Sequence, residues 1–333
     1  MPQPALDVLC LGNAIVDVIA TTDESFLVRH ALAKGSMALI DEARAEALYE
    51  AMGPATIVSG GSAANTAVGI ASLGVRAGFV GKIRDDEVGK IFAHDLRATG
   101  VTFATPVAVD GPATARSFIL VTPDGERTMN TYLGACQGLS AADVDPEMVR
   151  ASRVVYLEGY LWDPPAAKEA FRKAVEIAHG AGNLVALTLS DAFCVDRYRD
   201  EFLELMRNGS LDILFANTHE LKSLYGTADE EGALAALREE GILGVVTRSE
   251  RGALVVSRGQ TLAIDAHPVE RVVDTTGAGD LFAAGFLAGL VGDLDHATCA
   301  RLGGLAAAEV ISHIGARPQG SLVDMARDAG VLG

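Results

Sequence analysis

Residues 274–290 read DTTGAGDLFAAGFLAGL, a glycine-rich turn that leads directly into a run of small apolar residues typical of a buried helix. Gly277 and Gly279 predict a tight turn that brings consecutive N–H groups together at the helix N-terminus, which makes a ready anion site. Asp280 then falls in the first helical turn, beside the anion. A lone acid at this position would only stabilise the helix terminus, by about 0.3–1 kcal/mol. The full heptapeptide instead favours a base that takes a proton from an alcohol attacking phosphorus.

The chain around this turn alternates between strand and helix patterns. The runs VVYLEG (154–159), LVALTLS (184–190) and LDILFAN (211–217) indicate buried strands, and a helical pattern follows each of them. Near the N-terminus, LDVLCLGNAIVDVIA (6–20) indicates two more strands, broken at Gly12-Asn13. Repeated units of this kind predict an α/β fold with a doubly wound, mostly parallel sheet and helices on both faces.

Two insertions interrupt this pattern. Residues 102–134 alternate apolar and polar side chains around Asp110-Gly111 and Asp124-Gly125, which is typical of hairpins. Residues 13–44 and 102–134 together predict a discontinuous β lid over the carboxyl edge of the main sheet, where open α/β sheets bind ligands. The core would comprise residues 1–12, 45–101 and 135–333.

Composition limits the partners. The 333 residues include 27 Lys plus Arg against 44 Asp plus Glu, and the net charge of −17 argues against nucleic-acid and anionic membrane partners. A small molecule, including a nucleotide, remains compatible, because a few amides, an arginine and a metal ion reverse the potential locally. The low aromatic share of 5% predicts a core built on close approach of backbones.

The cysteines and the N-terminus indicate the cellular compartment of the protein. Four distant cysteines without a CxxC pair predict buried, reduced thiols. Met1–Asp7 lacks signal-peptide features, and the longest apolar stretch, Leu281–Gly292, is too short to cross a bilayer. We expect a cytoplasmic protein, either a monomer or a homodimer.

A second motif, GGSAAN (60–65), opens a helix after the strand TIVS. The paired glycines would let a substrate lie against bare backbone, and Asn65 offers a donor and an acceptor to vicinal hydroxyls. The motif equally fits a strand-to-helix turn with a serine cap. Taken alone, it does not decide between the two.

Together the two motifs resemble those of the ribokinase-like, or phosphofructokinase-B, family of carbohydrate and nucleoside kinases. GGSAANTAVGIASLG (60–74) is similar to the family's N-terminal signature and VVDTTGAGDLFAAGF (272–286) to its C-terminal one. The resemblance covers nearly the whole chain and implies an ATP-dependent phosphotransferase that uses Mg²⁺, with a lid sheet over the substrate.

The resemblance also implies residue roles. The catalytic group would be Asp280 as the base, the amides of Gly277, Ala278 and Gly279 as an anion hole, and Arg127 as a lid arginine over the phosphates. The sugar hydroxyls would be held by Asn13, Asp17, Gly60, Gly61 and Asn65. ATP would contact Asn217, Glu220, Thr247, Gly252, Thr276, Gly277 and Gly279, with Glu220 reaching Mg²⁺ through water. A K⁺ site would lie between the Asp274 loop and the carbonyls around Val310, His313 and Gly315. For Arg127, an exposed hairpin charge is an equal alternative.

Adenosine kinase-like members give the nearest resemblance, through LGNAIVDV (11–18) and RTMNTYLGAC (127–136). They imply the 5′-hydroxyl of adenosine or a related nucleoside as acceptor. Met129, Tyr132 and Leu133, with Met37, Leu39, Leu161 and Trp162, would form an apolar wall for the base. Met37 stands where eukaryotic adenosine kinases have a glutamine, and the apolar residues could instead only pack the lid.

Other functions remain open to different degrees. A free-sugar kinase for ribose, fructose or a keto-deoxy acid would share the catalytic residues. A non-catalytic nucleoside or sugar sensor is disfavoured because Asp280, both loop glycines and Glu220 are all present. A dinucleotide-dependent dehydrogenase lacks its G-x-G-x-x-G, and Gly81-Lys82-Ile83 does not make a Walker A motif.

Overall fold

A computed structural model describes residues 6–333; residues 1–5, expected to begin the core, lie outside the described part. Within it, the main sheet has nine strands in the order β14 (Gln260–Ile264), β13 (Ala253–Ser257), β12 (Leu243–Thr247), β11 (Ile213–Asn217), β10 (Leu184–Thr188), β9 (Val154–Glu158), β1 (Val8–Leu11), β5 (Ala77–Val80) and β6 (Thr102–Phe103). Only the pairs β12–β13 and β13–β14 are antiparallel among these described strands. The predicted mostly parallel sheet is confirmed.

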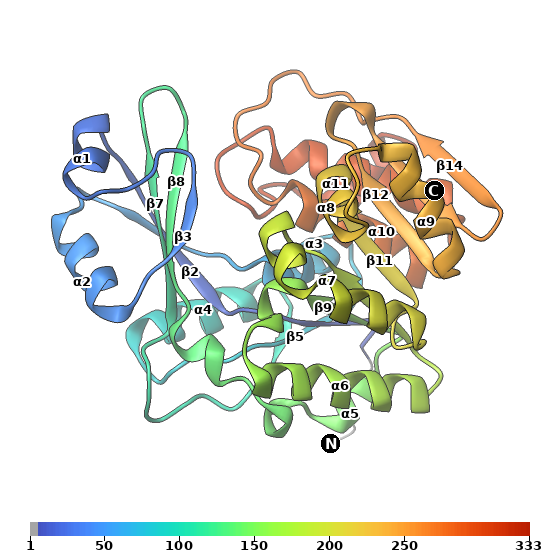
Figure 1. Cartoon of the computed structure of the whole chain (residues 1–333), viewed down its shortest axis with the longest axis horizontal. Helices are drawn as coiled ribbons and strands as arrows, with labels where there is room; N and C mark the ends of the chain where they lie inside the picture. Colours follow the sequence, from blue (N-terminus) through green and yellow to red (C-terminus); the bar gives the residue numbers. More distant parts are fainter. Residues whose placement is uncertain (1–5) are drawn as a thin grey trace.

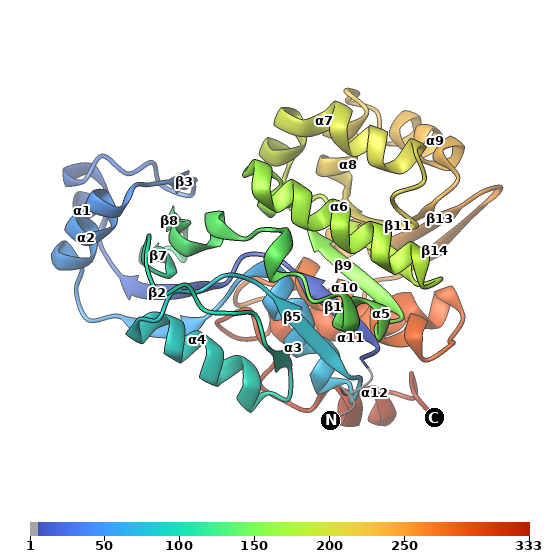
Figure 2. The same ribbon diagram turned by 90° about the horizontal axis from the view of Figure 1, so that it is seen from below.

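Helices cover both faces of this sheet, as expected of a doubly wound fold (Figure 2). One face packs against α3 (Ser62–Ser72), α4 (Glu87–Ala98), α10 (Ala278–Val291), α11 (His296–Val310) and α12 (Leu322–Asp328). The other packs against α5 (Pro146–Arg150), α6 (Pro165–Gly180), α7 (Ala192–Arg207), α8 (Thr218–Leu224) and α9 (Glu230–Glu240). Four short 3₁₀ helices complete the described chain: η1 (Gly134–Gly138), η2 (Ala141–Asp143), η3 (Gly159–Trp162) and η4 (Ser249–Arg251).

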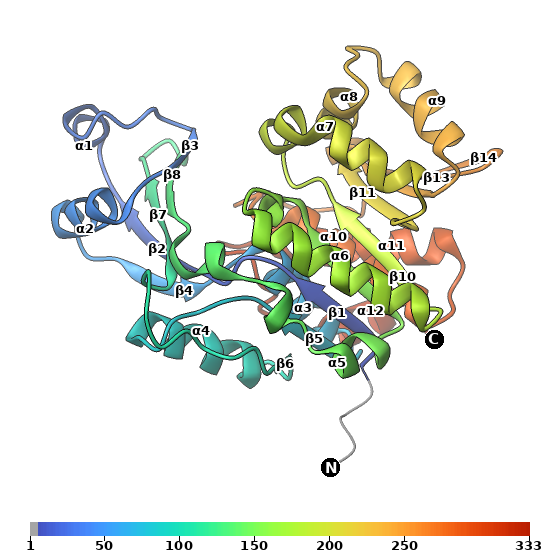
Figure 3. The ribbon, with the colours of Figure 1, turned by 60° about the horizontal axis from the view of Figure 1, so that its bottom comes forward.

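A second sheet forms the lid and stands beside the core (Figure 1). Its order is β3 (Met37–Leu39), β8 (Arg127–Tyr132), β7 (Ala115–Val121), β2 (Ile15–Thr21) and β4 (Thr56–Ser59). Helices α1 (Glu24–Arg29) and α2 (Glu42–Ala51) share a small apolar core with its outer face. The chain passes from β1 of the core into β2 of the lid through residues 12–14 (Figure 3).

The lid boundaries differ from the sequence prediction at two points. β4 lies in a segment assigned to the core but pairs with β2 of the lid. β6 lies in a segment assigned to the lid but pairs with β5 of the main sheet. Both strands are four residues or fewer, so neither carries enough alternation to indicate which sheet it joins.

The core relies on close helix contacts, as the low aromatic content predicts. A Cβ on Gly285 of α10 would lie 2.6 Å from the Gly303 Cα of α11, and one on Gly303 would lie 2.7 Å from the Phe282 carbonyl oxygen. Substitution at either glycine would therefore push α10 and α11 apart.

The cysteines behave as the sequence predicts. Cys10, Cys136, Cys194 and Cys299 are buried and free. Burial raises the pKa of each thiol, so none is an activated nucleophile. Among the helices of residues 6–333, none combines the length and hydropathy needed to span a bilayer.

Candidate active site

A cleft of about 360 Å³ opens between the lid and the carboxyl ends of the core strands. The lid contributes Asp17, Ser117, Ile119 and Met129 to its lining. The core contributes Gly61, Ser62, Asn65, Tyr160, Thr188, Ser190, Phe215, Ala216, Asn217, Glu220, Val245, Thr247, Thr276, Gly277, Gly279, Asp280, Phe282 and Ala316. Both sequence motifs thus meet in one cleft, although more than 200 residues separate them.

Asp280 lies in the first turn of α10 and points toward the N-terminus of α3. Its Oδ1 accepts a hydrogen bond from the Ser62 hydroxyl at 2.6 Å, and its Oδ2 accepts one from Asn65 Nδ2 at 3.1 Å. Burial raises the pKa of Asp280, and these two donors oppose that rise. The carboxylate is therefore held in a fixed orientation with its oxygens facing the cleft.

The glycines of the loop have different tasks. Gly277 has φ = 81°, in the left-handed region, and a Cβ there would collide with Ala316, so the turn requires glycine. Gly279 is already helical, and a Cβ on it would meet no atom within 4 Å. Of the three predicted anion-hole amides, Ala278 N–H donates to the Thr275 carbonyl at 3.3 Å. The amides of Gly277 and Gly279 are the better candidates to face an anion.

The predicted sugar anchor is formed where β2 of the lid meets the start of α3. A side chain on Gly60 would collide with the Asp17 carboxylate, and one on Gly61 (φ = 89°) with the Asn13 carbonyl. Burial raises the pKa of Asp17 to about 7, while Arg317 and Arg127 act in the opposite direction. Gly60 therefore leaves room for Asp17 to approach the backbone, and Gly61 leaves room for the Asn13 carbonyl.

Asn13 is not among the residues that line the cleft, and its expected role as a substrate ligand stays a prediction. Its Nδ2 donates to Glu158 Oε1 at 2.7 Å, deep inside the core. Glu158 also accepts from the Ala63 N–H at 2.9 Å, and burial raises the pKa of this carboxyl to about 7. Glu158 was missed from the sequence; its position at the end of a buried strand is the signal that could have identified it.

Arg127 reaches from the lid to the loop of the core. Its Nη2 lies 2.6 Å from Asp274 Oδ2, and its Nη1 donates to Thr276 Oγ1 at 3.1 Å. The arginine side chain is only 16% exposed, so an exposed hairpin charge is the wrong alternative. Asp274 Oδ2 also accepts from the Gly315 N–H at 3.0 Å, which brings together the two loops expected to hold K⁺.

Asn217 and Glu220 line the side of the cleft farther along the sheet and form a capping box at α8. Asn217 Nδ2 donates to Glu220 Oε1 at 2.6 Å, and the Glu220 N–H donates to Asn217 Oδ1 at 2.9 Å. Burial raises the pKa of Glu220 to about 7. Thr247 lines the same region, whereas Gly252 lies outside the lining and serves the turn before β13, at φ = 76°.

Strand register divides the inner face of the lid into rows. One row carries Ile19, Ile119, Met129 and Met37, which are cross-strand partners in β2, β7, β8 and β3. The next row carries Asp17, Ser117 and Thr131, with a hydrogen bond of 2.9 Å between the two hydroxyls, and ends at Leu39 on the edge. Partners in register share a face, so an apolar row lies beside a polar row.

Four residues expected in the apolar wall are placed elsewhere. Tyr132 belongs to the outer core of the lid with Phe118 and Leu48, because it alternates with Thr131 along β8. Trp162 and Leu161 are buried in the other core, and the indole N–H donates to Glu201 at 3.0 Å. Leu133 is not part of the lining. Of the residues expected in the apolar wall, Met129 is the one that lines the cleft.

One further charged residue was missed from the sequence. Arg317, in the loop after α11, donates from Nε to Asn65 Oδ1 at 3.2 Å. The loop was expected to supply only carbonyl groups, and no local pattern in HIGARPQG indicates that the arginine turns inward.

Known proteins match both this fold and this sequence. The pfkB family carbohydrate kinase model matches residues 5–321. An adenosine kinase from Sinorhizobium meliloti is 55% identical, with a TM-score of 0.93 over 98% of this chain and 99% of that one. A probable sugar kinase from Rhizobium etli is 50% identical, with a TM-score of 0.94 over the same shares. Fructokinase-1 from Oryza sativa subsp. japonica is 31% identical over 70% of this chain and 74% of its own. The chain belongs to the pfkB family of carbohydrate kinases, and it is a phosphotransferase that acts on an alcohol group of a sugar or nucleoside.

Proposed function

We propose that this kinase transfers the γ-phosphoryl group of ATP to the 5′-hydroxyl of adenosine or a closely related nucleoside. The observation that carries the proposal is the pair of rows on the inner face of the lid. The polar row offers Asp17 and the Ser117 hydroxyl to a ribose, and the adjacent apolar row offers Ile119 and Met129 to a flat base. A methionine side chain adapts to the edge of a purine, whereas a free sugar has hydroxyls on every side and would leave that row without a partner.

The chemistry proposed for the cleft needs positioning and charge stabilisation more than covalent catalysis. Asp280 accepts the proton of the attacking hydroxyl, while the amides of Gly277 and Gly279 and the guanidinium of Arg127 face the transferred group. Holding the reactants in line supplies roughly 7–11 kcal/mol of the barrier. The anion hole supplies about 3–4 kcal/mol more.

The residues present fit the two metal ions expected from the family. Asn217 and Glu220 offer side-chain oxygens to the cleft, which suit Mg²⁺ bound through water. When bound, Mg²⁺ would neutralise charge that develops on the phosphates. The hydrogen bond from the Gly315 N–H to the Asp274 side chain links the two loops between which a carbonyl-lined K⁺ site is expected.

The proposed substrate is tested by offering purified protein nucleosides and free sugars with ATP and Mg²⁺ and measuring ADP release. The proposal expects kcat/KM for adenosine to exceed that for ribose or fructose. The second candidate is a free-sugar kinase, favoured by the 31% identity to a fructokinase. Faster phosphorylation of a sugar than of any nucleoside would select this candidate and reject the nucleoside proposal.

A further inference from the structure

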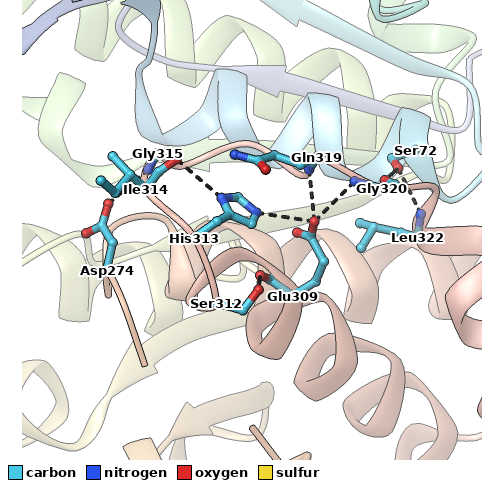
Figure 4. Close-up of polar contacts among 10 residues, drawn as sticks. All are labelled: Ser72, Asp274, Glu309, Ser312, His313, Ile314, Gly315, Gln319, Gly320 and Leu322. Atoms are coloured by element: carbon cyan, nitrogen blue, oxygen red, sulfur yellow. Dashed lines mark hydrogen bonds and ion pairs between the residues drawn. The ribbon is translucent and has the colours of Figure 1, made fainter. Parts of the chain in front are cut away.

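The loop that follows α11 is fastened at both ends. At its start, Gly315 N–H donates to Asp274 Oδ2 at 3.0 Å. At its end, the N–H groups of Gln319 and Gly320 donate to Glu309 Oε1 at 2.9 and 3.2 Å. His313 Nε2 lies 3.2 Å from the same oxygen, so a single carboxylate oxygen of Glu309 contacts three residues of the loop (Figure 4). Arg317 is held between these two attachments.

The guanidinium of Arg317 projects into the predicted sugar anchor. Its Nε donates to Asn65 Oδ1 at 3.2 Å, and its Nη2 donates to the Gly60 carbonyl at 3.4 Å. Within residues 6–333 it makes no ion pair with a carboxylate inside 4.0 Å. Burial lowers the pKa of Arg317 to about 10. The charges of Asp95 and Asp17 act in the opposite direction. A half-buried cation whose direct hydrogen-bond partners are both neutral is costly, which calls for an explanation beyond packing.

The contact fixes the orientation of the Asn65 amide. Because Oδ1 accepts from Arg317, the Nδ2 group must face the other way, where it donates to Asp280 Oδ2 at 3.1 Å. A flipped amide would set two donors against each other at Arg317 and two acceptors at Asp280. Arg317 therefore determines which atom of Asn65 faces the proposed base.

Asp17 approaches the same glycine that Arg317 contacts. A side chain on Gly60 would collide with the Asp17 carboxylate, and Arg317 binds the carbonyl of that glycine. Three charged groups act on Asp17: Arg317 and Arg127 favour its charged form, and Asp280 opposes it. Arg317 is the larger of the two favourable influences.

We propose that Arg317 is a positioning residue for the acceptor hydroxyls, which sets the amide of Asn65 and supplies a positive charge beside the Asp17 end of the same anchor. This inference rests on the proposed role of Asp17 and Asn65 as the anchor of the sugar, and it applies to a nucleoside and to a free sugar alike. The loss of kcat/KM on removal of a substrate hydroxyl should then depend on Arg317, although Arg317 itself need not touch the substrate.

Three variants separate the two tasks. Arg317→Lys keeps the charge, Arg317→Gln keeps a neutral donor for Asn65, and Arg317→Met removes both. Arg301→Met, an exposed arginine of α11, is the control. The measurements are kcat/KM for adenosine and for its 2′- and 3′-deoxy analogues across pH, with circular dichroism to verify folding.

In the wild type, loss of a hydroxyl that is bound to a charged group should cost about 10- to 100-fold in kcat/KM. Arg317→Met should reduce that preference about 10-fold, and should move the acidic limb of the pH profile upward by about one pH unit or more. Arg317→Lys should keep the acidic limb of the pH profile at its wild-type position. Arg317→Gln should retain part of the preference for the hydroxyl-bearing substrate, but its acidic limb should move as in Arg317→Met. The control should match the wild type in both measurements.

A folded Arg317→Met or Arg317→Gln with wild-type hydroxyl preference and a wild-type acidic limb would overturn the inference. If Arg317→Met does not fold, the Lys and Gln variants decide, because both keep a hydrogen-bond donor and only Lys keeps the charge. If the wild type phosphorylates a sugar but no nucleoside, the proposed substrate is wrong. The same variants are then compared on that sugar and its deoxy analogues, so the two failures remain distinct.

Discussion

Asn65 donates a hydrogen bond to Asp280, from Nδ2 to Oδ2 at 3.1 Å, and so joins the first helix of the N-terminal motif to the first turn of the C-terminal one. Ser62 holds the second oxygen of the same carboxylate at 2.6 Å. The proposed base and the proposed sugar anchor are therefore one hydrogen-bonded unit. In the proposed complex, a sugar hydroxyl bound by Asn65 would hold the acceptor hydroxyl of the same substrate near Asp280.

The first prediction concerns Asp280→Asn, which removes the base and changes little volume. We expect kcat to fall by about 10²–10⁴-fold, with substrate affinity almost unchanged. Single-turnover kinetics should be used, so that product release does not mask the chemical step. Ser62→Ala is the control, since it removes one hydrogen bond to the carboxylate and keeps the base. A variant that retains a tenth of wild-type kcat would reject the proposed role.

The second prediction uses the open space around Gly279. A valine there would fill the cleft and shield the adjacent amides, and the helical backbone tolerates it without left-handed strain. We expect Gly279→Val to fold and to lose ATP affinity by at least about 10-fold, equivalent to about 1.4 kcal/mol. Gly180→Val is the control, because Gly180 is also helical and unobstructed but lies in α6, outside the cleft. Wild-type ATP affinity in the folded Gly279 variant would contradict the anion-site assignment.

The third prediction separates the two faces of β8. Met129 lines the cleft, whereas Tyr132 packs in the outer core of the lid. Met129→Ala should raise the KM for adenosine about 10-fold with a small change in Tm, since about 1–2 kcal/mol of apolar contact with the base is lost. Tyr132→Ala should lower Tm by several degrees and affect KM less. The reverse pattern would show that the base does not lie on the apolar row.

Much of the fold could be predicted because its signals are local. The buried strands that end at Glu158 and Asn217 are continuous apolar runs, and the glycines around position 277 predict the turn there. The family resemblance then predicts Asp280, Asn65 and Asp17 as site residues, and all three line the cleft.

The remaining site residues depend on long-range packing. The resemblance puts Tyr132 near the base, but Tyr132 lies on the face of β8 opposite Met129 and Thr131, as the alternation of the strand requires. The resemblance places Asn13 at the substrate, but its contact with Glu158, 145 residues away, cannot be read from its own segment. Arg317 could not be found from its own segment, because its direction is set by Glu309 and Asp274, which fasten the loop.

The fourth prediction concerns monovalent cations. The approach of the Gly315 loop to Asp274 would let a K⁺ ion order the backbone behind the anion site. Activity should rise with K⁺ and not with Li⁺ at constant ionic strength, because loop carbonyls do not readily replace the tight hydration shell of the smaller ion. Enzyme assays in choline, lithium, sodium and potassium chloride make the comparison. Equal activity in all four salts would remove K⁺ from the proposed mechanism.

The last prediction is a pH dependence of stability. Burial raises the pKa of Asp17, Glu158 and Glu220 to about 7, from ordinary values of 3.8, 4.5 and 4.5. Between these values the folded protein holds more protons than the unfolded chain, so the free energy of unfolding should fall as pH rises. The stabilisation is complete below the unfolded pKa values and is lost as pH rises through about 7. Each of the three carboxyl groups lowers the free energy of unfolding by up to about 1.4 kcal/mol per pH unit over this range.

Denaturant unfolding measured from about pH 5 to about pH 8 tests this slope, because ordinary carboxyl groups no longer titrate there. Glu158→Gln supplies the matched comparison, since the amide has no proton to exchange in this range. The variant should show a shallower decline than the wild type, whatever its absolute stability. Glu46→Gln, on the exposed surface of α2, should leave the wild-type slope unchanged. Wild-type stability that rises over this interval would mean that the buried carboxyls stay charged at low pH, held by the Asn13 and Ala63 donors more strongly than burial opposes them.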